Sequence, residues 1–127
     1  MRKVKVYIAS PYTNGNKEEL VQLQLDAAYH LLKMGFNPFA PLYNHFIQKD
    51  HADLDKDFDW LEVDKVWLKD CDMAVRLYPL DKYGWEIASP GADEEEEYCK
   101  ELGIPMFKCS TLEDMVEKMK DVENTVE

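Results

Sequence analysis

The acidic run Asp93 to Glu97 contains the side chain whose position best suits nucleophilic or acid–base chemistry. If the run is helical, successive side chains turn by about 100°, and Glu95 is the only acid within the narrow apolar stripe. That stripe is formed by Ala92, Cys99 and Leu102. Acids in the first turns of a helix ordinarily serve solvation and the helix dipole. An acid on the buried stripe has no such explanation, so Glu95 is predicted to be a catalytic carboxylate.

Ser89, Pro90 and Gly91 precede this helix and form a second candidate element. A glycine there lets a ligand approach the backbone, and the amides at the start of a helix can hold an oxygen atom. We therefore predict that Ser89 and Gly91 bind substrate. The same residues also suit an ordinary capping turn, which stays open as an alternative.

A polar loop follows the first predicted strand, at the position where doubly wound folds bind their ligands. It contains neither G-x-G-x-x-G nor G-K-[ST], so it is no dinucleotide or Walker loop. Its hydroxyl and amide groups suit sugar hydroxyls or one phosphate better than a polyphosphate with its metal. The candidate binding residues are Ser10, Pro11, Tyr12, Thr13 and Asn14. A plain turn and helix cap is the alternative.

Other polar and aromatic residues near predicted strand ends are weaker candidates. Asp72 begins a strand and is either a turn residue or a pocket acid. Trp85 lies in a strand-end loop and either stacks on a base or anchors the loop. His45 and His51 share a loop with acids, but their spacing matches no standard ligand set, so neither a metal nor a cofactor is predicted.

Hydrophobic patterning supplies the elements that would position these residues. Val4, Val6 and Ile8 alternate with other residues up to Ser10-Pro11, which predicts a strand. Helices are predicted at 17–34, 55–69, 91–102 and 112–120, strands at 36–40, 73–77 and 104–107, and a long loop at 41–53. Strands separated by helices predict an α/β fold, an open three-layer sandwich of flavodoxin or Rossmann type with a four- or five-stranded parallel sheet. Ligands of such sheets bind beyond the carboxyl ends of the strands, which directs attention to loops 10–16, 41–51 and 79–91.

Length and charge limit the function classes. A chain of 127 residues with 46% hydrophobic residues suits one domain with a proper core. The formal net charge of −11 disfavours nucleic acid and anionic membrane surfaces as partners. Three cysteines form no disulfide framework, and neither a signal peptide nor a membrane-spanning stretch is apparent. We therefore expect a soluble, cytoplasmic protein.

Several patches of the chain together resemble the nucleoside 2-deoxyribosyltransferase superfamily, which includes deoxynucleoside 5′-monophosphate N-glycosidases and small phage and bacterial proteins. The patches are Val6 to Thr13, Asp70 to Met73, and Ser89 to Ala92 with Glu95, Cys99, Gly103 and Pro105. The resemblance implies that Glu95 attacks the anomeric carbon as an ionised carboxylate, which the amides at the start of its helix would help to keep charged. It also places the Ser10 to Asn14 loop, Ser89 and Gly91 around the sugar, allows Asp72 as a pocket acid, and implies a homo-oligomer.

The chain departs from the superfamily pattern at informative positions. Ser89 stands where the transferases often have an aspartate, and Cys99 replaces a usual alanine. The nucleotide hydrolases commonly carry an arginine in the first loop, where this chain offers only Lys17. The leaving-group acid is unassigned; Asp81, Asp72 and Tyr83 are the candidates.

The resulting prediction is cleavage or transfer of the N-glycosidic bond of a (deoxy)nucleoside or nucleoside monophosphate through a glycosyl ester on Glu95. The enzyme is either a hydrolase or a transferase. Two alternatives from other classes are a non-catalytic nucleoside-binding module and an acidic protein-interaction domain.

Overall fold

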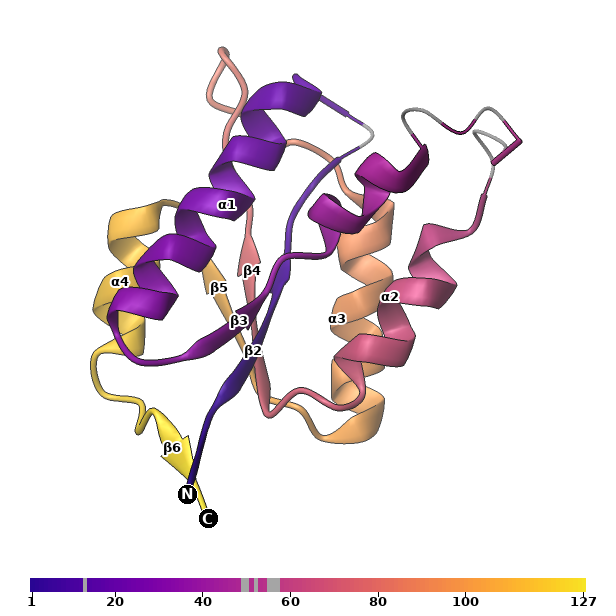
Figure 1. Ribbon diagram of the computed structural model, residues 1–127. Helices are drawn as coiled ribbons and strands as arrows, with labels where there is room; N and C mark the ends of the chain where they lie inside the picture. The colour runs from indigo at the N-terminus through magenta and orange to yellow at the C-terminus, as the bar shows by residue number, and fades with distance from the viewer. Residues whose placement is uncertain (13, 49–50, 52, 55–57) are drawn as a thin grey trace.

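Four short parallel strands form the central sheet of the computed structural model (Figure 1), which describes all residues except 13, 49–50, 52 and 55–57. The strands are β2 (Lys5–Ala9), β3 (Asn37–Phe39), β4 (Met73–Leu77) and β5 (Met106–Cys109), in the order β3-β2-β4-β5. Every neighbouring pair is parallel. The predicted α/β sandwich is confirmed, with four strands, and β3 lies at the edge of the sheet, as its proline favours.

Helices cover both faces of the sheet (Figure 1). One face carries α1 (Lys17–Lys33) and α4 (Leu112–Met119), and the other carries α2 (Trp60–Leu68) and α3 (Pro90–Leu102). Val6 and Ile8 pack into the core under α1 and α4, while Tyr7 and Ala9 pack into the core under α2 and α3. Because β2 is buried on both faces, Tyr7 is fully buried despite its hydroxyl, which matters for the pocket described below.

Helix boundaries follow the capping residues. Asp59 caps α2 by accepting a hydrogen bond from the Glu62 amide (3.2 Å), so α2 begins at Trp60; the predicted start at Asp55 lies outside the described residues. Part of the predicted loop 41–53 is instead a 3₁₀ helix, η1 (Pro41–Gln48). None of the helices in the described parts of the chain has the length and apolar character needed to cross a membrane.

A small antiparallel ribbon joins the two ends of the chain, and pattern analysis missed it because each of its strands has two residues. β1 (Arg2–Lys3) pairs with β6 (Thr125–Val126), which brings the termini side by side (Figure 1). Next to the ribbon, the Asn124 side chain donates a hydrogen bond to the Met34 carbonyl (2.9 Å). Asn124 thereby fastens the C-terminal segment to the end of α1.

Gly35 makes this attachment possible, because it has a φ of 95° and a Cβ there would lie 2.5 Å from the Asn124 amide nitrogen. We expect Gly35→Ala to destabilise the fold by more than Gly103→Ala. Gly103 also follows a helix with positive φ, but nothing lies within 4 Å of its Cβ position, so its cost is only the left-handed backbone, about 1 kcal/mol. Urea unfolding gives the free energy of unfolding of both variants. Repeating it in proteins that also carry Asn124→Ala measures how much of the cost comes from the contact between residue 35 and Asn124. Equal costs in the parent background would contradict this explanation.

Candidate active site

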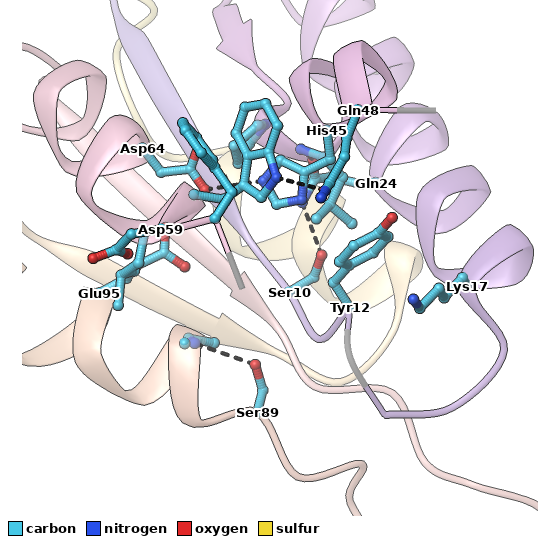
Figure 2. A pocket seen from close by; sticks show the side chains of 17 residues that line it. Ser10, Tyr12, Lys17, Gln24, His45, Gln48, Asp59, Asp64, Ser89 and Glu95 are labelled. Carbon is cyan, nitrogen blue, oxygen red and sulfur yellow. Dashed lines mark hydrogen bonds and ion pairs between the residues drawn. The ribbon is translucent and has the colours of Figure 1, made fainter. Parts of the chain in front are cut away.

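A pocket of about 510 Å³ opens beyond the carboxyl end of β2, between η1, α2 and α3. Its volume lies in the range of small-molecule sites. Five residues predicted from the sequence line it: Ser10, Tyr12, Ser89, Gly91 and Glu95. Figure 2 shows Glu95 at one end of the view, with Tyr12 and Lys17 at the other. The pocket is thus lined by described residues that follow β2 and β3 and by the segment that begins α3, at the edge of the sheet where the sequence predicts a site.

The other residues of the first loop have supporting positions. Pro11 is fully buried, and the Asn14 side chain donates a hydrogen bond to the Ala88 carbonyl (2.8 Å), which ties this loop to the segment before α3. Thr13 lies outside the described residues. Ser89 accepts a hydrogen bond from the Ala92 amide (3.2 Å), so it caps α3 while also lining the pocket.

Asp72 and Trp85 lie apart from this pocket. The Asp72 carboxylate receives two hydrogen bonds from the Arg2 guanidinium, both 2.6 Å, and a third from the Lys5 amide (2.8 Å). These bonds hold Asp72 at the amino end of β4, opposite the end where ligands bind, and the Arg2 hydrogen bond lowers the pKa of its carboxyl. Trp85 is 73% exposed in a turn organised by Asp81. The expectation of Asp72 as a pocket acid is therefore corrected, and Trp85 is not part of the pocket wall.

Glu95 has the orientation that its helical phase predicts. Ala92, Glu95 and Cys99 are all buried on one side of α3, although the stripe stops before Leu102, which is 47% exposed. The Tyr7 hydroxyl donates a hydrogen bond to Glu95 Oε2 from the central strand β2. A carboxyl group aimed at the pocket is thus held by a phenol that is itself fully buried.

Burial is the main influence on the ionisation of Glu95. Burial raises the pKa of Glu95 to about 8, and the hydrogen bond from Tyr7 lowers it only in part. The same burial raises the pKa of Tyr7 well above its ordinary value, reinforced by the nearby Glu95. Most Glu95 is therefore protonated at pH 7, whereas the resemblance implies an ionised nucleophile.

Gln24 positions the pocket loops and was missed by the sequence reasoning. It is buried, and its amide nitrogen donates to Ser10 Oγ (2.8 Å) and to the Ile8 carbonyl (3.2 Å). Its oxygen accepts a hydrogen bond from the Leu42 amide (2.9 Å). Gln24 shares the apolar side of α1 with Leu20, Ala27 and Leu31, so the phase test applied to α3 would have found it.

A buried histidine–carboxylate pair was also missed. His45 Nε2 on η1 lies 3.4 Å from Asp64 Oδ2 on α2, and each side chain is less than a tenth exposed. The His45 ring stacks on Trp60, with centroids 4.7 Å apart. His45 Nδ1 and Asp64 Oδ1 are buried without a hydrogen-bond partner among the described residues. Asp64 precedes the buried Leu68 by one turn, so helical phase was again the available signal.

The charges around the pocket restrict what it can hold. Among its described lining residues, Lys17 is the one lysine or arginine, and its Nζ lies 5.2 Å from the centre of the Tyr12 ring. In the described ranges no three His, Cys, Asp or Glu side chains are grouped so that they could share a metal ion. Hydroxyl, amide, carboxyl and imidazole groups are therefore the polar features available to a ligand.

The raised pKa of Glu95 predicts a pH-dependent effect of Glu95→Gln on stability. Between the ordinary glutamate pKa and about 8, the folded parent binds more protons than the unfolded chain, so its stability falls as pH rises. A neutral amide does not titrate. In urea unfolding, the free energy of unfolding of Glu95→Gln relative to that of the parent should increase from pH 5 to pH 9, by at most about 1.4 kcal/mol per pH unit. Glu97→Gln, on an exposed side of α3, is the control; a pH-independent difference for Glu95→Gln would contradict the burial explanation.

Comparisons with known proteins show a likeness of structure. No protein-family model and no curated protein sequence matches the chain. Among solved structures, the chain is similar to the 2-deoxyribosyltransferase of the psychrotolerant bacterium Bacillus psychrosaccharolyticus, with a TM-score of 0.62 and 23% identity over 84% of this chain and 72% of that one. The four-stranded parallel sheet and its helices therefore have the nucleoside 2-deoxyribosyltransferase-like fold that the sequence patches predicted.

Proposed function

We propose that this protein cleaves or transfers the N-glycosidic bond of a nucleoside, with Glu95 as the nucleophile. The observation that carries the proposal is a buried glutamate aimed into a ligand-sized pocket and hydrogen-bonded by Tyr7. The fold is consistent with it, because the 2-deoxyribosyltransferase that it resembles is a biocatalyst for the synthesis of antiviral and antitumoral nucleosides. Fold alone does not assign chemistry, so Glu95 is the essential support.

The reaction is a double displacement at the anomeric carbon. Tyr7 donates to Oε2, which leaves Oε1 of ionised Glu95 to form a bond with C1′ while the C1′–N bond breaks and its electron pair leaves with the base. The transition state resembles an oxocarbenium ion, and the product is a glycosyl ester of Glu95. Water then releases the free sugar, or a second base takes the glycosyl group and regenerates Glu95.

The leaving base needs a proton, and His45 is the proposed donor. Asp64 holds Nε2 of the imidazole, while Nδ1 is the buried atom with no partner among the described residues. An imidazolium in this position gives the Nδ1 proton to a base nitrogen and keeps its Nε2 hydrogen toward Asp64. The arrangement follows the general logic of a carboxylate that orients a histidine acid.

The substrate is proposed to carry little negative charge. Lys17 is the one described lysine or arginine at the pocket, and the chain has a net charge of −11, which repels polyphosphates. A nucleoside fits best, and a monophosphate is the upper limit. The products identify the acceptor: free sugar indicates water, and a new nucleoside indicates a second base. A homo-oligomer stays a prediction.

A non-catalytic nucleoside-binding module is the second candidate, favoured by one observation. With a pKa of about 8, Glu95 is mostly protonated at pH 7, and a protonated carboxyl donates a hydrogen bond instead of attacking carbon. Such a module would bind nucleosides saturably without releasing base at any pH.

Replacement of Glu95 tests the proposal. Base release from a panel of nucleosides and monophosphates, with and without free adenine, is measured by chromatography for the parent, Glu95→Gln and Glu97→Gln. We expect Glu95→Gln to lower kcat by more than about 10³-fold and Glu97→Gln to match the parent. For a p-nitrophenyl 2-deoxyriboside, whose leaving group needs no proton, kcat/KM of the parent should rise with pH through about 8. Undiminished turnover by Glu95→Gln would refute the mechanism, and binding without turnover by the parent would favour the second candidate.

Leaving-group dependence tests the role of His45. His45→Gln should slow release of natural bases by about 10²-fold or more, yet hardly affect a p-nitrophenyl 2-deoxyriboside, whose leaving group departs without a proton. His30→Gln, on the last turn of α1, is the matched control. An equal loss with both kinds of substrate would contradict a proton-donating role for His45.

A further inference from the structure

Arg76 is a charged residue in the central strand β4, where a cation is costly. Its register partners are Ala9 on β2 and Lys108 on β5, so it lies between two strands. The alternation of strand side chains places it on the same face as Ala74, which packs in the core under α2 and α3. Its side chain is only 14% exposed. A guanidinium in that position destabilises the fold unless carboxylates pair with it.

Two carboxylates of α3 meet this requirement. Arg76 Nη2 lies 2.7 Å from Asp93 Oδ1, and Nη1 lies 3.0 Å from Glu96 Oε1. The second oxygen of Glu96 lies 3.1 Å from Lys108 Nζ on the neighbouring strand β5. Charged groups of the adjacent strands β4 and β5 thus hold α3. Because the two guanidinium nitrogens of Arg76 bind two different carboxylates, this fork fixes the orientation of α3 as well as its distance from β4.

The two partners of Arg76 stand on either side of Glu95 in the sequence of α3. Asp93 and Glu96 are three residues apart, so they project from neighbouring positions on one side of the helix. Glu95 projects from a different side, toward Tyr7. Rotation of α3 about its axis would break the contacts of Arg76 and turn Glu95 away from Tyr7 together.

We propose that Arg76 is the positioning residue for Glu95: by holding Asp93 and Glu96 against β4, it fixes the rotation of α3 and hence the direction in which Glu95 enters the pocket. This inference rests on the proposed function for its kinetic consequences. A displacement of about 1 Å at a reacting group can cost about 10²-fold in rate. Arg76 therefore controls the reaction without touching the substrate.

The charges around Glu95 give Arg76 a second, separable effect. Glu95 is faced by Tyr7 from β2, by Asp64 and Lys65 from α2, and by Arg76 from β4, while Cys99 lies one turn further along α3. Asp64 raises the pKa of Glu95, whereas Arg76 and Lys65 lower it. Loss of the positive charge of Arg76 should raise that pKa, and loss of the fork alone should not.

Two substitutions separate position from charge. Arg76→Gln removes both the fork and the charge, and Arg76→Lys removes the two-point fork and keeps the charge. Lys100→Gln is the control, because Lys100 is an exposed partner of the same Glu96 (3.6 Å) outside the pocket. Each protein is assayed for kcat and KM across pH, and the Glu95 carboxyl is titrated by ¹³C NMR, with Glu95→Gln used to assign its signal.

We expect Arg76→Gln to lower kcat by 10- to 100-fold with KM changed less than about threefold, and to move both the Glu95 titration and the acidic limb of kcat to higher pH. Arg76→Lys should lower kcat with the titration near that of the parent, and Lys100→Gln should change neither. Glu96→Gln, which breaks one arm only, provides a second variant if Arg76→Gln does not fold. It should lower kcat without raising the pKa of Glu95.

Parent-like kcat and Glu95 titration in Arg76→Gln would overturn the inference. A second result would also overturn it: activity that falls only in proportion to the loss of folded protein, with the Glu95 titration unchanged. A purely structural ion pair predicts that result. If the parent shows no turnover, the proposed function fails by itself. The ¹³C chemical shift of the Glu95 carboxyl then still tests the positioning: Arg76→Lys should move it from its parent value, and a parent-like shift would overturn the inference.

Discussion

Burial of one carboxyl group between α3 and the central sheet is the constraint on which the other features of the site depend. Glu95 loses its water and gains the Tyr7 hydroxyl in return, an exchange that leaves its pKa at about 8. Tyr7 can reach it only because β2 is buried on both faces, with Val6 and Ile8 turned to the opposite core. A charge that is costly to form inside the protein is also a strong nucleophile once formed, since no water needs to be removed from it.

Three helices contribute a polar residue on their buried side, and all three residues lie at the pocket: Gln24 on α1, Asp64 on α2 and Glu95 on α3. Each would weaken a purely structural core unless it were paired. Gln24 forms hydrogen bonds with the segments that follow β2 and β3, and Asp64 lies against His45. At the pocket, polar contacts therefore replace apolar packing on the buried sides of these helices.

Local patterns were sufficient to predict the α/β class, the parallel sheet and the phase of Glu95. Gln24 and Asp64 lie on the buried sides of α1 and α2 and carry the same signal of helical phase, but neither was predicted. Other features depend on contacts between distant parts of the chain. Nothing near Asp72 in the sequence indicates Arg2, which lies 70 residues away, and no local pattern indicates that burial would raise the pKa of Glu95. Two-residue strands such as β1 and β6 are too short to give a pattern.

Trapping of the glycosyl–enzyme ester is the most direct measurement of the central claim that Glu95 attacks the sugar. A 2-fluoro-2-deoxynucleoside slows breakdown of the ester, because the fluorine destabilises the oxocarbenium-like transition state. The protein is incubated with it at pH 8, close to the pKa of Glu95, and is then digested and analysed by mass spectrometry. The account predicts one added fluorodeoxyribosyl group on the peptide that contains Glu95. Base release accompanied by an adduct on another residue would contradict the account. Base release that slows without any adduct on the protein would also contradict it.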